Sequence, residues 1–473
     1  MSLGSMRRGN RPLGLLHFLA LLMPVLSFCG CSASQPAAAA APAVASPAPT
    51  PPAIAVPASA PALPPRIEPI YPIMLGIDVL EAEGFAPVKG RRLGLLTHPA
   101  GVNRRGERTI DVLRRAPGVN LVALYGPEHG INGDAPAEFK VPDSVDRRTG
   151  LPVFSVYGNY RKPTKPMLKG IEAMVVDLQD IGTRSYTFVS AMKWTMEACF
   201  EAGIEVIVLD RPNPLGGLKV DGPPLDAQWA VNNYVGAFRV PYVHGLTIGE
   251  LARMAKEAPG VLAVPDAVRA RGRLTVVQMR GWTRSMRWTD TGLTWVPTSG
   301  MIQDFSAVQG YPMVGLGTYF DPKAKFEIGF YHGVGTAYPF RGLSHKTAKI
   351  DVLEKELRAL PVHGIQFRRV TVPDRKGEPA VGLFIDITDY DAWQPTELNF
   401  FLMRLACKLD PRNPFAPAPG RDFSGFLRHL GSVAFFNDLS RHGARVDVEA
   451  WLRTWHEQAR IYQEQSKKYW LYR

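Results

Sequence analysis

The chain has 473 residues, 46% of them hydrophobic and 21% charged, with a formal net charge of +12. This length is enough for two or three domains with real hydrophobic cores. The positive charge favours anionic surfaces such as cell-wall polymers or lipid headgroups. No recognisable nucleic-acid-binding motif and no long basic run occurs, so we expect no nucleic-acid partner. Only four cysteines occur, without the spacing of a disulfide framework.

The first segment has the pattern of a bacterial export signal. Arg7, Arg8 and Arg11 precede the apolar run Leu13 to Phe28, which is too short and one-sided for a stable membrane anchor. The run ends in Ser-Phe-Cys-Gly-Cys, which resembles a lipobox with Cys31 as the lipidated residue and Cys29 as the alternative. An ordinary cleaved signal peptide is the other interpretation. Residues 1–31 therefore predict export to the cell envelope, on the periplasmic side and lipid-anchored.

Residues 32–66 are almost entirely alanine and proline with serine, threonine and valine. Such a composition buries no core and is typical of an extended tether. About 407 residues follow, in which we expect a catalytic domain at 67–300 and a second domain at 301–473. Cys199 and Cys407 are the cysteines of this part, and we expect both to be free thiols.

Apolar runs in the first of these domains end repeatedly in polar residues. The runs and their polar ends are Gly94–Leu96 with Thr97 and His98, Val119–Leu124 with Glu128 and His129, Met174–Val176 with Asp177, Gln179 and Asp180, and Val206–Leu209 with Asp210, Arg211 and Asn213. Continuous apolar runs are typical of strands buried on both faces. Helical spacing in 108–115 and 186–202 separates these strands. This alternation predicts a Rossmann-like, doubly wound parallel sheet, with the polar ends along one edge.

The segment after residue 300 predicts a smaller α+β domain. Residues 364–372 and 381–389 have strand character, and 398–409 form an amphipathic helix. Apolar residues at helical spacing in 446–473 predict a closing helix. A cleft between the two domains is the expected site.

Several chemistries lack sequence support. The ten histidines show no metal-binding spacing, so we expect no metal, and His129 is more typical of a hydrogen-bonding residue. No Walker loop, Gly-x-Ser-x-Gly elbow or Gly-x-Gly-x-x-Gly turn follows a strand, which argues against nucleotide and serine chemistry. We therefore expect no cofactor.

Four motifs, in order, carry a resemblance to a known family. They are GPEHG at 126–130, DLQDIGTRSYTF at 177–188, VLDRPNPLGG at 208–217 with VDGPPLD, and HGLTIGELA at 244–252. Together they resemble the DUF1343 family, whose characterised members are exo-β-N-acetylmuramidases. The resemblance covers about Gly76 to Ala252 and resumes at Tyr462 to Tyr472. It implies a glycoside hydrolase that removes terminal N-acetylmuramic acid from peptidoglycan fragments.

Glycosidases commonly need one carboxylic acid to protonate the leaving oxygen and a second group that attacks or activates water. Glu128 suits the first role, while Asp177, Asp180 and Glu327 are candidates for the second. The 2-acetamido group of the sugar is a further alternative, because it can act as an internal nucleophile. The order of motifs does not choose between retention and inversion.

Muramic acid carries a lactyl carboxylate, for which Arg184 or Arg211 is the candidate partner. Further candidates for substrate binding follow from their donor and acceptor groups: His129, Asn132, Gln179, Asn213, His244 and Glu327. Each also has a structural interpretation, since Asp and Asn after a strand often cap a helix or hold a turn.

The second half departs from the family pattern. Trp295-Val-Pro is followed by Thr-Ser-Gly rather than Ser-Pro-Asn, and residues 313–340 look remodelled. We expect an active glycosidase, because the Glu128 loop is intact. The alternatives are a non-catalytic lipoprotein that binds muropeptides or wall polymer, and a relative with altered specificity.

Overall fold

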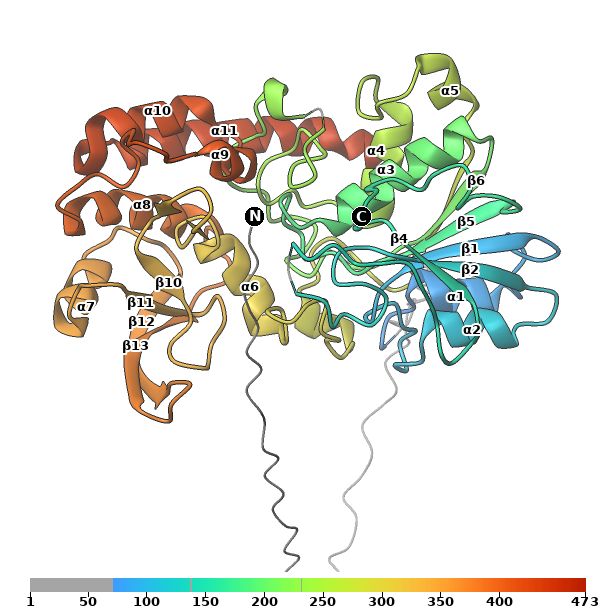
Figure 1. The fold of residues 1–473 in the computed structure, drawn as a ribbon, viewed down its shortest axis with the longest axis horizontal. Coiled ribbons are helices and arrows are strands. Elements are labelled where there is room, and N and C mark those ends of the chain that lie inside the picture. Colours follow the sequence, from blue (N-terminus) through green and yellow to red (C-terminus); the bar gives the residue numbers. More distant parts are fainter. Residues whose placement is uncertain (1–70, 137, 231) are drawn as a thin grey trace, which may run out of the picture. The chain divides into compact units, whose positions relative to one another are not determined.

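The computed structural model describes residues 71–473, apart from 137 and 231 (Figure 1). The described residues belong to one compact unit. The predicted signal segment at 1–31, with Cys31, and the predicted tether at 32–66 lie outside the described residues. Within the described part, no helix has both the length and the apolar character needed to cross a membrane.

The first half contains a seven-stranded sheet in the order β3-β4-β2-β1-β5-β6-β7. All its neighbouring strands are parallel except β3, which runs antiparallel to β4. The strands are β1 (Arg92–Thr97), β2 (Asn120–Gly126), β3 (Ser144–Val145), β4 (Pro152–Ser155), β5 (Ala173–Asp177), β6 (Glu205–Leu209) and β7 (Leu274–Val277). The predicted Rossmann-like parallel sheet is confirmed.

Helices cover both faces of this sheet, α1 and α2 on one side and α3 and α4 on the other (Figure 1). They are α1 (Gly76–Ala82), α2 (Thr109–Arg115), α3 (Phe188–Glu201), α4 (Ile248–Glu257) and α5 (Asp266–Arg271). Successive strand residues point to opposite faces, so each strand contributes to two cores. In β5 and β6, Val176 and Val208 pack with the α3 side, whereas Val175 and Ile207 pack with the α1 side.

The second half is a smaller part with an antiparallel sheet in the order β10-β11-β13-β12. Its strands, with the separate pair β8 and β9, are β8 (Phe320–Asp321), β9 (Phe326–Glu327), β10 (Phe330–His332), β11 (Gly342–His345), β12 (Ile365–Pro373) and β13 (Pro379–Ile387). Its helices are α6 (Phe305–Val314), α7 (Ile350–Arg358), α8 (Glu397–Leu409), α9 (Ser424–Leu430), α10 (Val433–His442) and α11 (Val448–Ser466). The predicted α+β character is confirmed.

The core on the α3 side continues into the second half. Phe400 of α8, Phe435 of α10 and Trp455 of α11 belong to the same buried cluster as Met192 of α3. The expected closing helix ends at Ser466, and a short 3₁₀ turn and an extended segment complete the chain. Cys199 and Cys407 are both free, as predicted.

Candidate active site

Glu128 lies in the turn that follows β2, at the carboxyl end of the sheet. His129 and Gly130 both have left-handed backbone conformations, with φ of 68° and 74°, which turn the chain sharply. The turn is held by a contact of 2.8 Å between the His129 ring Nδ1 and the Ala135 carbonyl oxygen. Glu128 is only 8% exposed.

Both carboxylate oxygens of Glu128 accept a hydrogen bond. The Thr187 hydroxyl donates to Oε2 at 2.7 Å, and the Glu138 backbone N–H donates to Oε1 at 3.0 Å. Thr187 directly precedes α3 on the loop after β5, so two separate loops orient one carboxylate. A carboxylate fixed in this way is suited to act on a bound molecule in one geometry.

Glu128 lines a cavity of about 540 Å³, here called the Glu128 cavity. Its polar and aromatic walls include His129, Asp134, Glu138, Tyr157, Ser185, Tyr186, Thr187, Ser299, Tyr311, Phe340 and His429. They come from loops of the first half and from α6, α9 and the segment before β11 of the second, so the cavity lies between the two halves. The volume suits a sugar unit and part of its neighbour.

The electrostatics of the cavity follow from burial. Burial, and then the nearby Glu128 charge, raise the pKa of Tyr157 to about 12. Burial also raises the pKa of Tyr311 to about 12 and lowers the pKa of His429 to about 4. The tyrosines and His429 are therefore neutral hydrogen-bonding groups near pH 7.

Strained backbone gathers around the same cavity. His129, Glu138 and Phe340 all line it, and all have left-handed φ values of 68°, 62° and 58°. Such conformations cost free energy in non-glycine residues and cluster at functional sites. The cavity is therefore the strongest candidate for the active site.

Asp177 has a different environment from Glu128. It is 0% exposed at the end of β5, and its carboxylate binds the Arg211 guanidinium at 2.5 and 2.9 Å. The Thr109 hydroxyl also donates to it. Asp177 does not line the Glu128 cavity. Its contacts hold Arg211 in place.

Asp180 and His244 lie next to each other, outside the lining of the Glu128 cavity. The Gly182 backbone N–H donates to Asp180 Oδ2 at 2.7 Å, and His244 Nε2 is 3.6 Å from that oxygen. His244 Nδ1 accepts a hydrogen bond from the Leu246 backbone N–H. Both residues are buried, and they lie on the loop after β5 and on the segment before α4.

Arg184 and Asn213 form hydrogen bonds to backbone groups and do not line the Glu128 cavity. Arg184 donates to the carbonyl oxygens of Leu430 and His429 at 3.0 and 3.2 Å, and burial lowers its pKa to about 10. Asn213 donates to the Leu246 carbonyl and accepts from the Leu215 N–H, each at 3.0 Å. These contacts hold the loops of the two halves in place.

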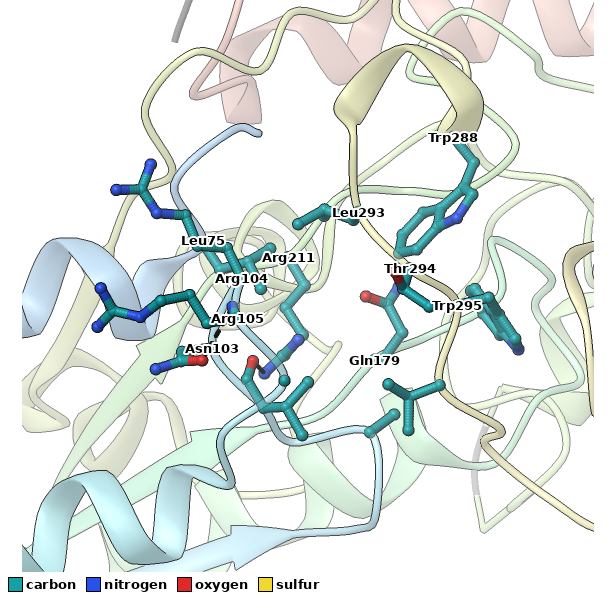
Figure 2. Close-up of a pocket in the computed structure, with 14 residues that line it drawn as sticks. Leu75, Asn103, Arg104, Arg105, Gln179, Arg211, Trp288, Leu293, Thr294 and Trp295 are labelled. Carbon is teal, nitrogen blue, oxygen red and sulfur yellow. Dashed lines mark hydrogen bonds between the residues drawn. The ribbon is translucent and has the colours of Figure 1, made fainter. Parts of the chain in front are cut away.

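Gln179 and Arg211 line a second cavity of about 320 Å³ (Figure 2). It shares no lining residue with the Glu128 cavity. Asn132 is exposed and lines neither cavity. Glu327, on β9, is half-buried, accepts a hydrogen bond of 2.6 Å from the Tyr331 hydroxyl, and also lines neither. The structure thus brings Glu128 and His129 together, and separately Gln179 and Arg211.

Several cavity residues were missed from the sequence. Thr187 lies within the motif at 177–188, two residues after Ser185, but a threonine before a helix has an ordinary structural interpretation. Glu138 acts through its backbone N–H, which no residue type reveals. His429 comes from α9, about 300 residues after Glu128, and no local pattern signals this contact. Among the described residues, no group of three or more His, Cys, Asp or Glu side chains is arranged to hold a metal ion.

Comparison with known proteins gives consistent matches along both halves. Residues 93–306 match the model of the N-terminal region of the exo-beta-N-acetylmuramidase NamZ, and residues 325–472 match that of its C-terminal region. The chain is 36% identical over 347 residues to the peptidoglycan beta-N-acetylmuramidase NamZ of Bacillus subtilis (strain 168), covering 72% of this chain and 79% of that protein.

Two solved structures of DUF1343 family proteins from Bacteroides fragilis NCTC 9343 share the fold. One is 36% identical, with a TM-score of 0.74, and covers 86% of this chain and 100% of its own. The other is 24% identical, with a TM-score of 0.63, and covers 85% and 99%. The resemblance drawn from the four motifs is confirmed: the chain belongs to the exo-β-N-acetylmuramidase NamZ family.

Proposed function

We propose that this protein is an exo-acting glycoside hydrolase that releases terminal N-acetylmuramic acid from peptidoglycan fragments. The observation that carries the proposal is Glu128, which is nearly buried and fixed through both oxygens at the wall of a cavity of about 540 Å³. Family membership supports the same activity.

Glu128 is the proposed general acid. Each carboxyl oxygen has two lone-pair positions, so the hydrogen bonds from Thr187 and Glu138 leave a position on each oxygen for the transferred proton. The acid would protonate the glycosidic oxygen as the bond to the sugar breaks.

The second group is proposed to act from the same cavity. Asp134 and Glu138 both line it and are exposed to it, whereas Asp177 is committed to Arg211. The 2-acetamido group of the substrate is the other candidate, because it can attack the anomeric carbon from within the sugar. Neutral Tyr157, Tyr311 and His429 can bind sugar hydroxyls.

The test is release of the chromogenic group from an aryl β-N-acetylmuraminide, with the corresponding N-acetylglucosaminide as the control substrate. The wild type should cleave the muraminide selectively. Glu128→Gln should lower kcat for an unactivated muramyl disaccharide by about 100-fold or more, because a sugar leaving group, unlike an aryl group, needs the proton that a general acid supplies. Glu327→Gln is the matched control, since this half-buried carboxylate is hydrogen-bonded but lies outside the cavity.

Full activity of Glu128→Gln on the disaccharide would overturn the assignment of the acid. Binding of muropeptides by the wild type without any cleavage would favour the alternative of a non-catalytic wall-binding protein. Cleavage of both sugars at similar rates would favour a relative with altered specificity.

We further propose that the protein is exported and lipid-anchored at the cell envelope. The arginines, apolar run and lipobox-like end of residues 1–31 support this location. Cys31→Ser should move the protein from the membrane fraction to the soluble fraction, whereas Cys29→Ser should not. The reverse result would assign the lipid to Cys29.

A further inference from the structure

The second cavity lies at the same edge of the sheet as the Glu128 cavity but has its own walls. The loops after β1, β5 and β6 and the segment 288–296 form it (Figure 2). We propose that this cavity, here called the Gln179 cavity, is a separate binding site for a carboxylate-bearing monosaccharide.

The first argument comes from Gln179, which is only 3% exposed. The nitrogen of its side-chain amide has hydrogen-bond partners, but the oxygen has none among the described residues. Its Nε2 donates to the carbonyl oxygens of Asp180 and Pro212 at 2.8 and 3.0 Å. A flipped amide would place its oxygen against both carbonyl oxygens, so this orientation is fixed. Gln179 lines the cavity, and its buried Oε1 accepts no hydrogen bond within the described part of the chain. A buried acceptor without a donor is unfavourable, and a ligand hydroxyl or amide N–H would satisfy it.

The charge of the walls supplies the second argument. Arg104, Arg105 and Arg211 line the cavity, and no carboxylate does among the residues that the structure describes. Their acidic partners, Asp78, Glu81 and Asp177, lie behind the wall. Figure 2 shows the guanidinium groups of Arg104 and Arg105 directed away from Gln179, and they bind the Pro72 carbonyl oxygen and Glu81. Arg211 is therefore the cation that faces the contents of the cavity, as a site for a carboxylate requires, and the other two arginines add positive charge nearby.

Arg211 is the best placed of these cations. It is 3% exposed, and its Nε and Nη2 bind Asp177 and the Val102 carbonyl oxygen. Its Nη1 makes no hydrogen bond to any described residue, which leaves one donor for a ligand. The Asp177 contact fixes the guanidinium before a ligand arrives, so little ordering cost remains.

The size and the apolar wall define the rest of the ligand. Trp288 and Trp295 pack edge to face, with ring centroids 5.0 Å apart, and both line the cavity with Leu293 (Figure 2). Aromatic walls suit the C–H face of a sugar ring. A volume of about 320 Å³ is at the small end for ligand sites, which favours a single ring.

The test is calorimetric titration of the mature wild type with N-acetylmuramic acid, and with N-acetylglucosamine, which lacks the lactyl carboxylate. N-acetylmuramic acid is such an acidic sugar and is also the product expected from the proposed function. Binding at equilibrium needs no turnover, so this result is readable even where hydrolysis fails.

Thr294→Trp places a large ring at an exposed position of the cavity wall and should abolish one class of N-acetylmuramic acid site. Thr289→Trp is the matched control, because this exposed threonine lies in the same segment but lines neither cavity. N-acetylglucosamine should bind the affected site at least ten-fold more weakly. Unchanged binding by Thr294→Trp, or equal binding of the two sugars at that site, would overturn the proposal.

Arg105→Gln covers the case in which Thr294→Trp does not fold. Arg105 is 66% exposed, so its replacement is well tolerated by the fold. It should weaken N-acetylmuramic acid binding about three-fold or more, and added salt should reduce the difference from the wild type. An affinity equal to that of the wild type at low salt would contradict the role of this positive wall.

Discussion

The orientation of the Glu128 carboxylate depends on two hydrogen-bond donors of different kinds. Thr187 uses a side-chain hydroxyl, whereas Glu138 uses a backbone N–H that its left-handed conformation makes available. A substitution at Glu138 leaves an N–H in place, but a substitution at Thr187 removes the donor. Thr187 is therefore the positioning residue whose role can be tested by one replacement.

Thr187→Val keeps the shape of the side chain but removes its hydroxyl. We expect kcat to fall about ten- to a hundred-fold with little change in KM, because a misdirected acid slows the chemical step more than substrate binding. The measurement is steady-state hydrolysis of the muramyl disaccharide, whose sugar leaving group needs the acid. Thr195→Val is the control, since the buried Thr195 hydroxyl on α3 makes no hydrogen bond among the described residues. Equal losses in the two variants would indicate a packing effect.

For single residues, the sequence predicted the location at a strand end better than the contacts that the side chain makes there. Glu128 and His129 follow a strand and lie together in the cavity, as strand ends suggest. Asp177 and Arg211 also follow strands, yet they bind each other, because opposite charges at adjacent strand ends pair when both are buried. Which of these outcomes occurs depends on side-chain directions that spacing does not specify.

The segment after α11 has a role that the helical spacing of its apolar residues did not predict. Apolar spacing predicts a helix to the end of the chain, but the helix ends at Ser466 and the last residues extend across α4. Leu471 N–H donates to Glu250 at 2.8 Å, and the Tyr472 hydroxyl donates to Asp210 at 2.6 Å. The buried partners, unknown from the sequence, end the helix.

Tyr472→Phe tests how much the hydrogen bonds of this C-terminal segment contribute to the stability of the fold. The Tyr472 hydroxyl donates to Asp210 and accepts from the Met279 N–H at 3.0 Å, so its loss leaves two buried groups short of a partner. We expect the free energy of unfolding in urea to fall by about 1–3 kcal/mol.

Tyr462→Phe in α11 is the matched control, because that hydroxyl has no hydrogen-bond partner among the described residues. It should change stability by less than about 0.5 kcal/mol. A Tyr472→Phe variant as stable as this control would show that the C-terminal segment is held by packing alone.

For the whole molecule, the parallel sheet was predictable and the joining of the halves was not. Continuous apolar runs specify strands buried on both faces, and β5 and β6 indeed contribute to both cores. The core that α3 shares with the helices α8, α10 and α11 is built from segments about 200 residues or more apart in the sequence. Local patterns carry no information on such pairs.

Buried neutral histidines make the stability of the whole molecule depend on pH. Burial lowers the pKa of His98 well below 6.5, and His98 Nε2 accepts a hydrogen bond of 2.9 Å from the Gln179 N–H, which requires the neutral ring. Burial also lowers the pKa of His332 and His429 to about 4. The unfolded chain binds these protons more readily than the folded one.

The contribution of these histidines to the free energy of unfolding should therefore be constant well above pH 6.5 and fall as the pH decreases from 6.5 towards 5. Burial raises the pKa of Asp210 to about 7, which acts in the opposite direction and is common to the wild type and the variant compared below. Urea denaturation at a series of pH values measures this slope. In His98→Gln, whose amide oxygen can accept the same N–H, the slope should be smaller by about 1 kcal/mol per pH unit. Identical slopes for the two proteins would show that His98 does not titrate on unfolding.

Both ends of the described chain converge on the residue that follows β6. The Gly76 N–H donates to the Asp210 carbonyl oxygen at 2.9 Å, and the Tyr472 hydroxyl donates to the Asp210 carboxylate. Since these ends lie side by side, a short linker could join them without disturbing either core. The exposed turn at 375–377 between β12 and β13 then offers a place to open the chain. We therefore expect a chain joined at these ends and opened at this turn to keep the same fold, with its segments synthesised in a different order.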